Sequence, residues 1–228
     1  MTPPENGAIS PETLPPLQRL LAAYAPAEVR AWHALCWSLD QRLAGVVRRG
    51  GEPTITAIRL AWWDAVLVED DRAKGGGEPL VEQWRDLAPD SVNGAVARLI
   101  DGWRVLASPE ALGDDDLLAY GQARGGGLFS SLAALGTGAE PRAVETAGGL
   151  WALWDLAAHV QDEALAARAL LVARALISDG AGPVRGATLK PLRLARAIVE
   201  PDVLAGRVPR GGFSLRHYGR LLMASLKG

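Results

Sequence analysis

Apolar residues recur at intervals of three and four positions along most of this chain, the spacing that places them on one face of an α-helix. No segment alternates convincingly between apolar and polar residues with period two. The pattern therefore predicts an all-α fold. The expected helices cover residues 26–47, 54–71, 79–86, 93–107, a segment from 114 past Tyr120, 140–177 with a break near Gly148-Gly149, 189–199 and 213–226.

The two ends of the chain differ in character. Residues 1–16 contain five prolines and lack the basic and apolar regions of a signal peptide, so they predict a disordered arm. Residues 17–228 have the length of one domain, and we expect a single helical bundle there. The longest stretch without charged residues, 125–139, is too short to cross a bilayer, which takes about 20 residues. We expect a cytoplasmic protein.

Composition supports helices and narrows the function. Alanine and leucine make up nearly a third of the chain, against 2 phenylalanines and 3 tyrosines. The net charge of −2 gives no strong overall field toward nucleic acid or a membrane. Cys36 is the only cysteine, so no intramolecular disulfide forms, and its apolar neighbours indicate a buried side chain.

Charge is distributed unevenly. Residues 184–228 carry 9 basic and 2 acidic residues, whereas the rest of the chain is acidic. Two interpretations remain open. The basic segment presents a cationic strip to an anionic partner, a lipid head group or a diphosphate, or it neutralises the acidic body of the same molecule.

The predicted helix 140–177 carries a polar stripe. Asp155, His159, Asp162 and Glu163 fall at i, i+4, i+7 and i+8 and so share one helix face. Carboxylates suit Mg²⁺, and His159 suits a transition metal better. The alternative is an ordinary solvated charged face.

Other residues stand out singly. Asp40 is the only acid between Glu28 and Glu52, which indicates either a buried functional carboxylate or a side chain that reaches water at the helix edge. Arg59 precedes Trp63 by four residues, where a guanidinium can lie over the indole. Glycines after Tyr120 predict a close approach of another helix or a ligand.

Four segments in order resemble the squalene/phytoene synthase family, which has the all-α isoprenoid synthase fold. Residues 30–40 resemble the helix before the first Asp-rich motif, and Glu52-Pro53 with 58–63 resembles a Glu-Pro … Arg-Leu-x-Trp-Trp segment. Tyr120 with the glycines after it resembles a Tyr-x-x-x-Val-Ala-Gly helix. Residues 148–163 lie where the second Asp-rich motif is expected.

The resemblance implies a helical bundle around a central cavity, in which two Asp-x-x-x-Asp motifs hold Mg²⁺ and promote loss of diphosphate. This chain departs from both motifs. Ala44 replaces the second aspartate of the first motif, and at the second motif His159 and Glu163 replace aspartates. A site lacking half of its metal ligands should ionise an allylic diphosphate poorly.

Two functions follow from the resemblance and its departures. The first is a catalytically degenerate protein that binds an isoprenoid or another apolar ligand, or that acts as an assembly or scaffold factor through a protein partner. The second is a divergent prenyl transferase of terpenoid biosynthesis that acts on allylic prenyl diphosphates with Mg²⁺. Neither involves nucleic acid or a transmembrane segment, and peripheral membrane contact is compatible with both.

The resemblance also implies roles for individual residues. Catalytic roles fall to Asp40, His159, Asp162 and Glu163, of which Asp40, Asp162 and Glu163 would hold the metal. Ligand contacts fall to Arg30, Cys36, Arg59, Trp63, Tyr120, Gly125, Gly126 and Asp155.

Overall fold

The computed structural model describes residues 13–49, 52–108, 110–178, 182–210 and 213–226. Over these residues it contains helices and turns and no strand, which confirms the all-α prediction. The helices are α1 (Pro16–Ala23), α2 (Ala27–Arg48), α3 (Pro53–Leu67), α4 (Pro79–Leu87), the 3₁₀ turn η2 (Asp90–Val92), α5 (Asn93–Val105), α6 (Asp114–Tyr120), the π-helical turn η3 (Gly121–Gly125), α7 (Gly126–Ala133), α8 (Pro141–His159), α9 (Glu163–Ser178), α10 (Lys190–Leu204) and α11 (Leu215–Leu226).

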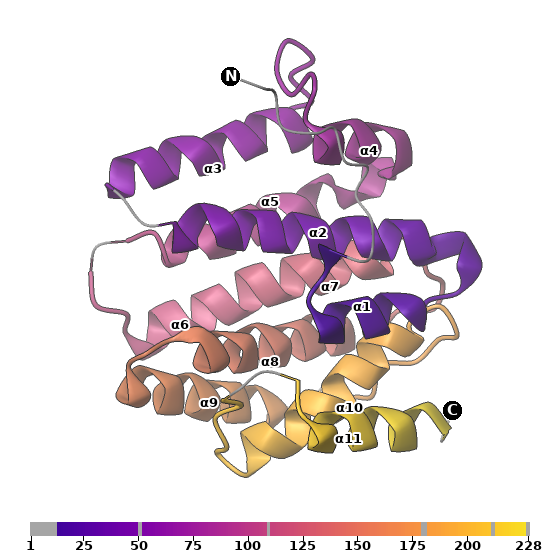
Figure 1. Ribbon diagram of the computed structural model, residues 1–228, viewed down its shortest axis with the longest axis vertical. Coiled ribbons are helices and arrows are strands. Elements are labelled where there is room, and N and C mark those ends of the chain that lie inside the picture. The colour runs from indigo at the N-terminus through magenta and orange to yellow at the C-terminus, as the bar shows by residue number, and fades with distance from the viewer. Residues whose placement is uncertain (1–12, 50–51, 109, 179–181, 211–212, 227–228) are drawn as a thin grey trace.

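The helices form one bundle (Figure 1). Helices α3 and α4 lie at one end, with α2 and α5 next to them, and α10 and α11 lie at the opposite end. Between these ends, α6, η3 and α7 continue one another as a single rod that packs against α5 on one side and α8 on the other. None of the described helices is long and apolar enough to cross a membrane.

Aromatic rings fill the interior where α2, α7 and α8 meet. The ring of Trp37 lies 5.0 Å from that of Trp151 and 6.1 Å from that of Phe129, both in edge-on contacts. All three side chains are buried. The central cavity that the resemblance implies is therefore not established, because side chains occupy this part of the bundle.

Glycines let three elements approach one another at backbone distance. A Cβ atom on Gly125 would lie 2.1 Å from the carbonyl oxygen of Gly148, and one on Gly102 would lie 2.2 Å from the backbone nitrogen of Arg124. Cβ atoms in proteins do not come so close to backbone atoms. The close approach predicted for the glycines after Tyr120 thus exists, and it joins η3 to α5 and α8.

The predicted helix 140–177 is divided into α8 and α9, but the position expected for the break is wrong. Helix α8 runs unbroken through Gly148-Gly149, where a break was expected, and stops at His159. The Asp162 carboxylate then accepts hydrogen bonds from the backbone N–H groups of Ala164 and Leu165 and so caps the first turn of α9. The chain turns at this cap, and the polar stripe is divided between two helices.

Two further boundaries differ from the sequence-based expectation. The arm expected at 1–16 falls on residues 1–12, which lie outside the described part, and on four described residues, of which Pro16 begins α1. Proline fits the first helical position because its missing N–H has no partner there in any case. The segment around Tyr120 also extends further than expected, through α7 to Ala133.

Candidate functional site

A buried ion pair joins α2 to η3. Arg124 donates from Nε to Oδ1 of Asp40 at 2.9 Å and from Nη2 to Oδ2 at 2.8 Å. The Asp40 side chain is 0% exposed and that of Arg124 1%. Trp103 on α5 also donates its indole N–H to Oδ1 of Asp40, at 3.0 Å. Of the two interpretations of Asp40, the buried carboxylate is correct, and both of its oxygens are engaged.

The same guanidinium reaches α8. Nη1 of Arg124 lies 2.8 Å from Oδ2 of Asp155 and donates to the hydroxyl of Tyr120 at 2.5 Å. Its plane lies over the ring of Trp103, 4.2 Å from the centroid. Arg124 thus lies between Asp40 on α2 and Asp155 on α8 and forms ion pairs with both carboxylates.

The electrostatics of this Asp40–Arg124–Asp155 cluster follow from burial and charge. Burial alone would lower the pKa of Arg124, but the charges of Asp40 and Asp155 outweigh it and raise that pKa well above its usual range. Burial also raises the pKa of the Tyr120 hydroxyl, so that it stays protonated. At neutral pH the Arg124 guanidinium is therefore charged and the Tyr120 hydroxyl is neutral.

The other proposed metal ligands lie away from Asp40. Asp162 caps α9, and the side chain of Glu163 is 87% exposed and pairs with Arg210. The predicted polar stripe does not lie on one helix face, because α8 ends at His159 and α9 begins at Glu163. Its members are Asp155, His159, Asp162 and Glu163. Among the described residues, no three His, Cys, Asp or Glu side chains lie together as metal ligands.

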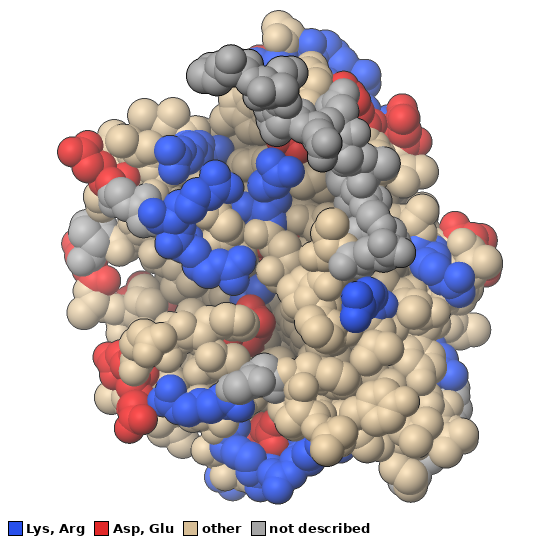
Figure 2. All heavy atoms as spheres, in the orientation of Figure 1, with Lys and Arg blue, Asp and Glu red and all other residues tan. Residues whose placement is uncertain are grey.

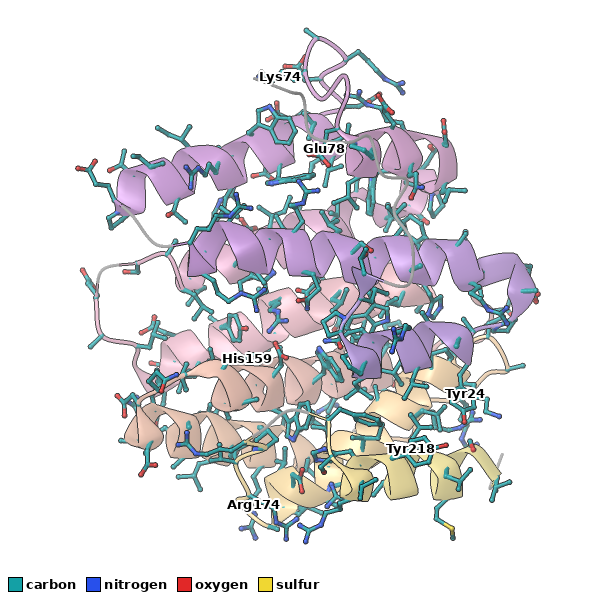
Figure 3. The ribbon with its side chains drawn as sticks, viewed as in Figure 1. Tyr24, Lys74, Glu78, His159, Arg174 and Tyr218 are labelled. Carbon is teal, nitrogen blue, oxygen red and sulfur yellow. The ribbon has the colours of Figure 1, made fainter. Side chains whose placement is uncertain are left out.

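His159 remains beside Asp155. It is the last residue of α8 and is exposed on the face seen in Figure 3. Its Nδ1 lies 2.7 Å from the backbone oxygen of Asp155 and 3.5 Å from the Oδ1 carboxylate atom. It is thus available to a ligand at the surface.

The ligand-binding residues expected in the first two resembling segments, 30–40 and 58–63, do not form one site. Arg30 is exposed and donates to the backbone oxygen of Ala25. Cys36 is buried, and burial raises the pKa of its thiol, so it is a poor nucleophile. Arg59 is exposed, whereas Trp63 is buried in edge contact with Trp62. In the described chain, the guanidinium that covers an indole is that of Arg124, not of Arg59.

The residues expected in the third segment are all buried. Tyr120 belongs to the cluster, and Gly125 packs against α8 through backbone contact. Gly126 faces the side chain of Glu145. The two glycines are therefore packing residues, and of this segment Tyr120 lies closest to a site.

A small pocket opens beside the cluster, between α1, α2, α8 and the N-terminal side of α11. Its volume is ≈ 140 Å³. Asp155, His159 and Arg48 contribute charged or titratable groups to its wall. The remaining lining is mostly apolar: Pro15, Pro16, Leu17, Ala44, Trp151, Trp154, Ala158, Pro209 and Phe213, with Gln18 and Gln41.

One cation, Arg48 at the end of α2, lies in the wall of this pocket and is exposed. Arg49 and Arg59 are also exposed, at the end of α2 and on α3. Figure 2 shows blue side chains gathered over this part of α2 and α3, next to a hollow in the surface. We call the pocket with this basic edge the α2–α8 pocket.

A second buried charge cluster fixes the C-terminal helix. Asp202 on α10 accepts from Arg207 at 2.8 Å, from Arg220 at 2.9 Å and from Nε2 of His217 at 2.8 Å. Burial alone would raise the pKa of Asp202, but the hydrogen bonds from Arg220 and His217 outweigh it and lower that pKa to about 2.

Ser214, His217 and Asp202 are linked in the order of a catalytic triad. However, Nδ1 of His217 also accepts the backbone N–H of Ser214, at 3.2 Å, as in the capping of a helix start. The charge of Asp202 is already balanced by two arginines. We therefore interpret this group as the structural anchor of α11.

Sequence reasoning missed Arg124 and Trp103, the side chains that donate hydrogen bonds to Asp40. Arg124 lies 84 residues from Asp40, and no local pattern pairs them. The one available signal was that Arg124 lies among glycines that predict a close approach of another helix, so that its backbone belongs to a packed segment.

Comparison with known proteins adds no relative. No family model, curated protein or solved structure matches the chain.

The buried side chain of His33 on α2 gives a prediction about how stability depends on pH. Burial lowers the pKa of His33 from 6.5 to about 4, while a backbone hydrogen bond with Leu132 raises it by less. The unfolded chain then binds the proton more strongly than the folded one. We expect the free energy of unfolding to fall by up to about 3 kcal/mol as the pH drops from 6.5 to 4.

Urea denaturation across this pH range measures the effect, with His33→Gln as the comparison. The variant should show a flatter dependence between pH 6.5 and 4. Equal slopes for both proteins would show that His33 is not the group responsible.

Proposed function

We propose that this chain is a squalene/phytoene-synthase-like protein without prenyl transferase activity, which binds an anionic isoprenoid in the α2–α8 pocket without a metal ion. The observation that carries the proposal is the position of Arg124. Its guanidinium is held by both Asp40 and Asp155, the carboxylates that the resemblance assigns to metal and ligand binding. A protein cation thus pairs with Asp40, a carboxylate that the resemblance assigns to Mg²⁺, and with Asp155, which it assigns to the ligand.

The pocket suits a ligand with an anionic head and a short apolar body. Arg48 and His159 stand at its edge, and the indoles of Trp151 and Trp154 form part of its wall. The Asp155 carboxylate also faces the pocket, and Arg124 offsets only part of its charge because Asp40 shares the same guanidinium. A volume of ≈ 140 Å³ is below the roughly 300–1,000 Å³ of common ligand sites, so a short prenyl chain fits better than a long one.

The alternative of a divergent prenyl transferase requires carboxylates free to hold Mg²⁺. Asp40 has no free oxygen, and Asp162 and Glu163 lie elsewhere. Ionisation of an allylic diphosphate needs several positive charges on the leaving group in a dry site. We therefore favour binding over turnover.

Thermal unfolding in the presence of ligand tests the proposal. We would titrate geranyl, farnesyl and geranylgeranyl diphosphate, each in Mg²⁺ and in EDTA. Ligand at about 100 times its dissociation constant adds roughly 2.7 kcal/mol, a shift of several degrees. We expect equal shifts in Mg²⁺ and EDTA, and no gain in affinity from geranyl to geranylgeranyl. A shift lost in EDTA, or no shift with any diphosphate, would contradict the proposal.

Two variants locate the site in the same assay. Arg48→Gln removes a charge from the edge of the α2–α8 pocket and should weaken binding about tenfold, the value of one charge-assisted hydrogen bond. Arg174→Gln removes an exposed arginine from α9, away from the pocket (Figure 3), and should leave binding unchanged. Equal losses in both variants would indicate attraction to net charge without a defined site.

A further inference from the structure

Helix α11 carries an apolar face that nothing in the described chain covers. Its buried residues, His217 and Leu221, point to one side. On the opposite side, large apolar residues recur at intervals of three and four and are between 45% and 90% exposed. This α11 stripe consists of Leu215, Tyr218, Leu222 and Leu226, with Met223 beside it.

The side of α11 opposite the stripe already contacts α10, so the stripe is not the face by which α11 packs on the bundle. His217 and Arg220 both bind Asp202 on α10. At the other end, Lys190 donates to the backbone oxygen of Ser225 at 3.3 Å. These contacts fix α11 on α10 and leave the stripe exposed.

The region around the stripe is cationic. The described residues from 182 to 226 include eight lysines and arginines and two acids: Arg185, Lys190, Arg193, Arg196, Arg207, Arg210, Arg216 and Arg220, against Glu200 and Asp202. Both acids are paired with arginines of the same segment, and Arg210 pairs with Glu163. At least four of the eight cations are therefore in ion pairs, and the segment keeps a net positive charge. In Figure 2 the surface over α11 is nearly free of charged residues, and blue side chains border it below and at the right.

We propose that the α11 stripe docks on an anionic lipid bilayer. An exposed helix with leucines, a methionine and a tyrosine on one side and cations around it has the properties of an interfacial amphipathic helix. Tyrosine favours the boundary between lipid and water, and the cations complement anionic head groups. The stripe is a convex ridge that a fluid bilayer accommodates. A second copy of this chain would place cations against cations, with no unpaired acid of this segment to meet them.

This inference is independent of the proposed ligand, although the two sites are close. Phe213 lines the α2–α8 pocket, and its ring lies 6.4 Å from that of Tyr218 in the stripe. Docking through α11 would therefore bring the pocket near the membrane surface.

Flotation of the full chain with vesicles tests the inference. The probes are vesicles of phosphatidylcholine alone and of equal parts phosphatidylcholine and phosphatidylglycerol. We expect binding to the anionic vesicles, which weakens as salt is added because the electrostatic part is screened. Absence of binding to the anionic vesicles at low salt would overturn the inference, whether or not diphosphates bind.

Matched variants assign the binding to α11. Leu215→Glu combined with Leu222→Glu should lower the partition coefficient at least tenfold, because two exposed leucines leave the lipid contact. Leu171→Glu combined with Ile58→Glu makes the same charge change at exposed positions on α9 and α3 and should have a much smaller effect. Circular dichroism verifies that both variants fold.

Two outcomes of this comparison would contradict membrane docking. Equal losses in the two double variants would mean that net charge alone is responsible. A wild-type dimer in analytical ultracentrifugation that becomes monomeric in the stripe variant, without vesicle binding, would assign the stripe to self-association.

Discussion

Replacing Arg124 with methionine is expected to lower the free energy of unfolding by about 3–5 kcal/mol, the cost of leaving a buried charge without its partner. Asp40 is fully buried, and Arg124 supplies two of its hydrogen bonds. Urea denaturation of the wild type and the variant at neutral pH measures the loss.

Two controls separate the buried pair from the mere removal of an arginine. Arg98→Met breaks the half-exposed pair with Glu145 and should cost less than about 1 kcal/mol. The double variant Asp40→Asn with Arg124→Met removes both charges and should recover about 2 kcal/mol or more of the loss. If the double variant were as unstable as the sum of its single changes, the two side chains would not be coupled as described.

Gly148→Ala is the second change with a large expected effect, a loss of about 3 kcal/mol or more, at the upper end of overpacking costs. The new Cβ would lie 2.0 Å from the carbonyl oxygen of Gly125, and backbone cannot move aside as a flexible side chain can. Helix α8 must therefore shift away from η3. That shift also moves Asp155 away from Arg124, so we expect weaker ligand binding together with lower stability.

Gly219→Ala is the matched control for this substitution. Gly219 lies within α11, and nothing stands within 4 Å of the Cβ that alanine would add. The change should raise the free energy of unfolding by about 0.5–1 kcal/mol, since alanine favours the helix over the unfolded chain. A Gly148→Ala variant as stable as Gly219→Ala would contradict the close contact of α8 and η3.

The helical pattern could be predicted from local sequence, because the spacing of apolar residues in an amphipathic helix shows which side is buried. This holds for α2, α5 and α11, whose expected ranges lie within a few residues of the observed ones. It fails where one residue type has two roles. Asp162 contributes a charge to an apparent stripe, yet its carboxylate is a helix cap, and the glycines at 148–149 mark a helix contact where a break was expected.

The candidate site was only half predictable. Asp40 stood out as a lone acid among apolar residues, and Asp155 lay at the expected second motif. Their partner did not stand out, because a long-range ion pair leaves no periodic signal. Helical spacing accounts for the hydrogen bond between Arg124 and Tyr120, four residues earlier, but it does not reveal the partners of Arg124 on α2 and α8.

A guanidinium between two carboxylates differs from a divalent metal ion in charge and in coordination. It carries one positive charge, which Asp40 and Asp155 already share, and it has no open coordination position for a diphosphate oxygen. The cluster can hold α2, η3 and α8 together. On the proposed function, we expect it to contribute little to the departure of a diphosphate group.

The most direct test of this account is an assay for inorganic diphosphate released from geranyl, farnesyl and geranylgeranyl diphosphate by the wild-type protein in the presence of Mg²⁺. The account predicts no release above the protein-free control, at ligand concentrations that raise the unfolding temperature in Mg²⁺ and in EDTA alike. Release that requires Mg²⁺ and disappears in the conservative variant Asp155→Asn would contradict it, because a metal would then share the site with Arg124.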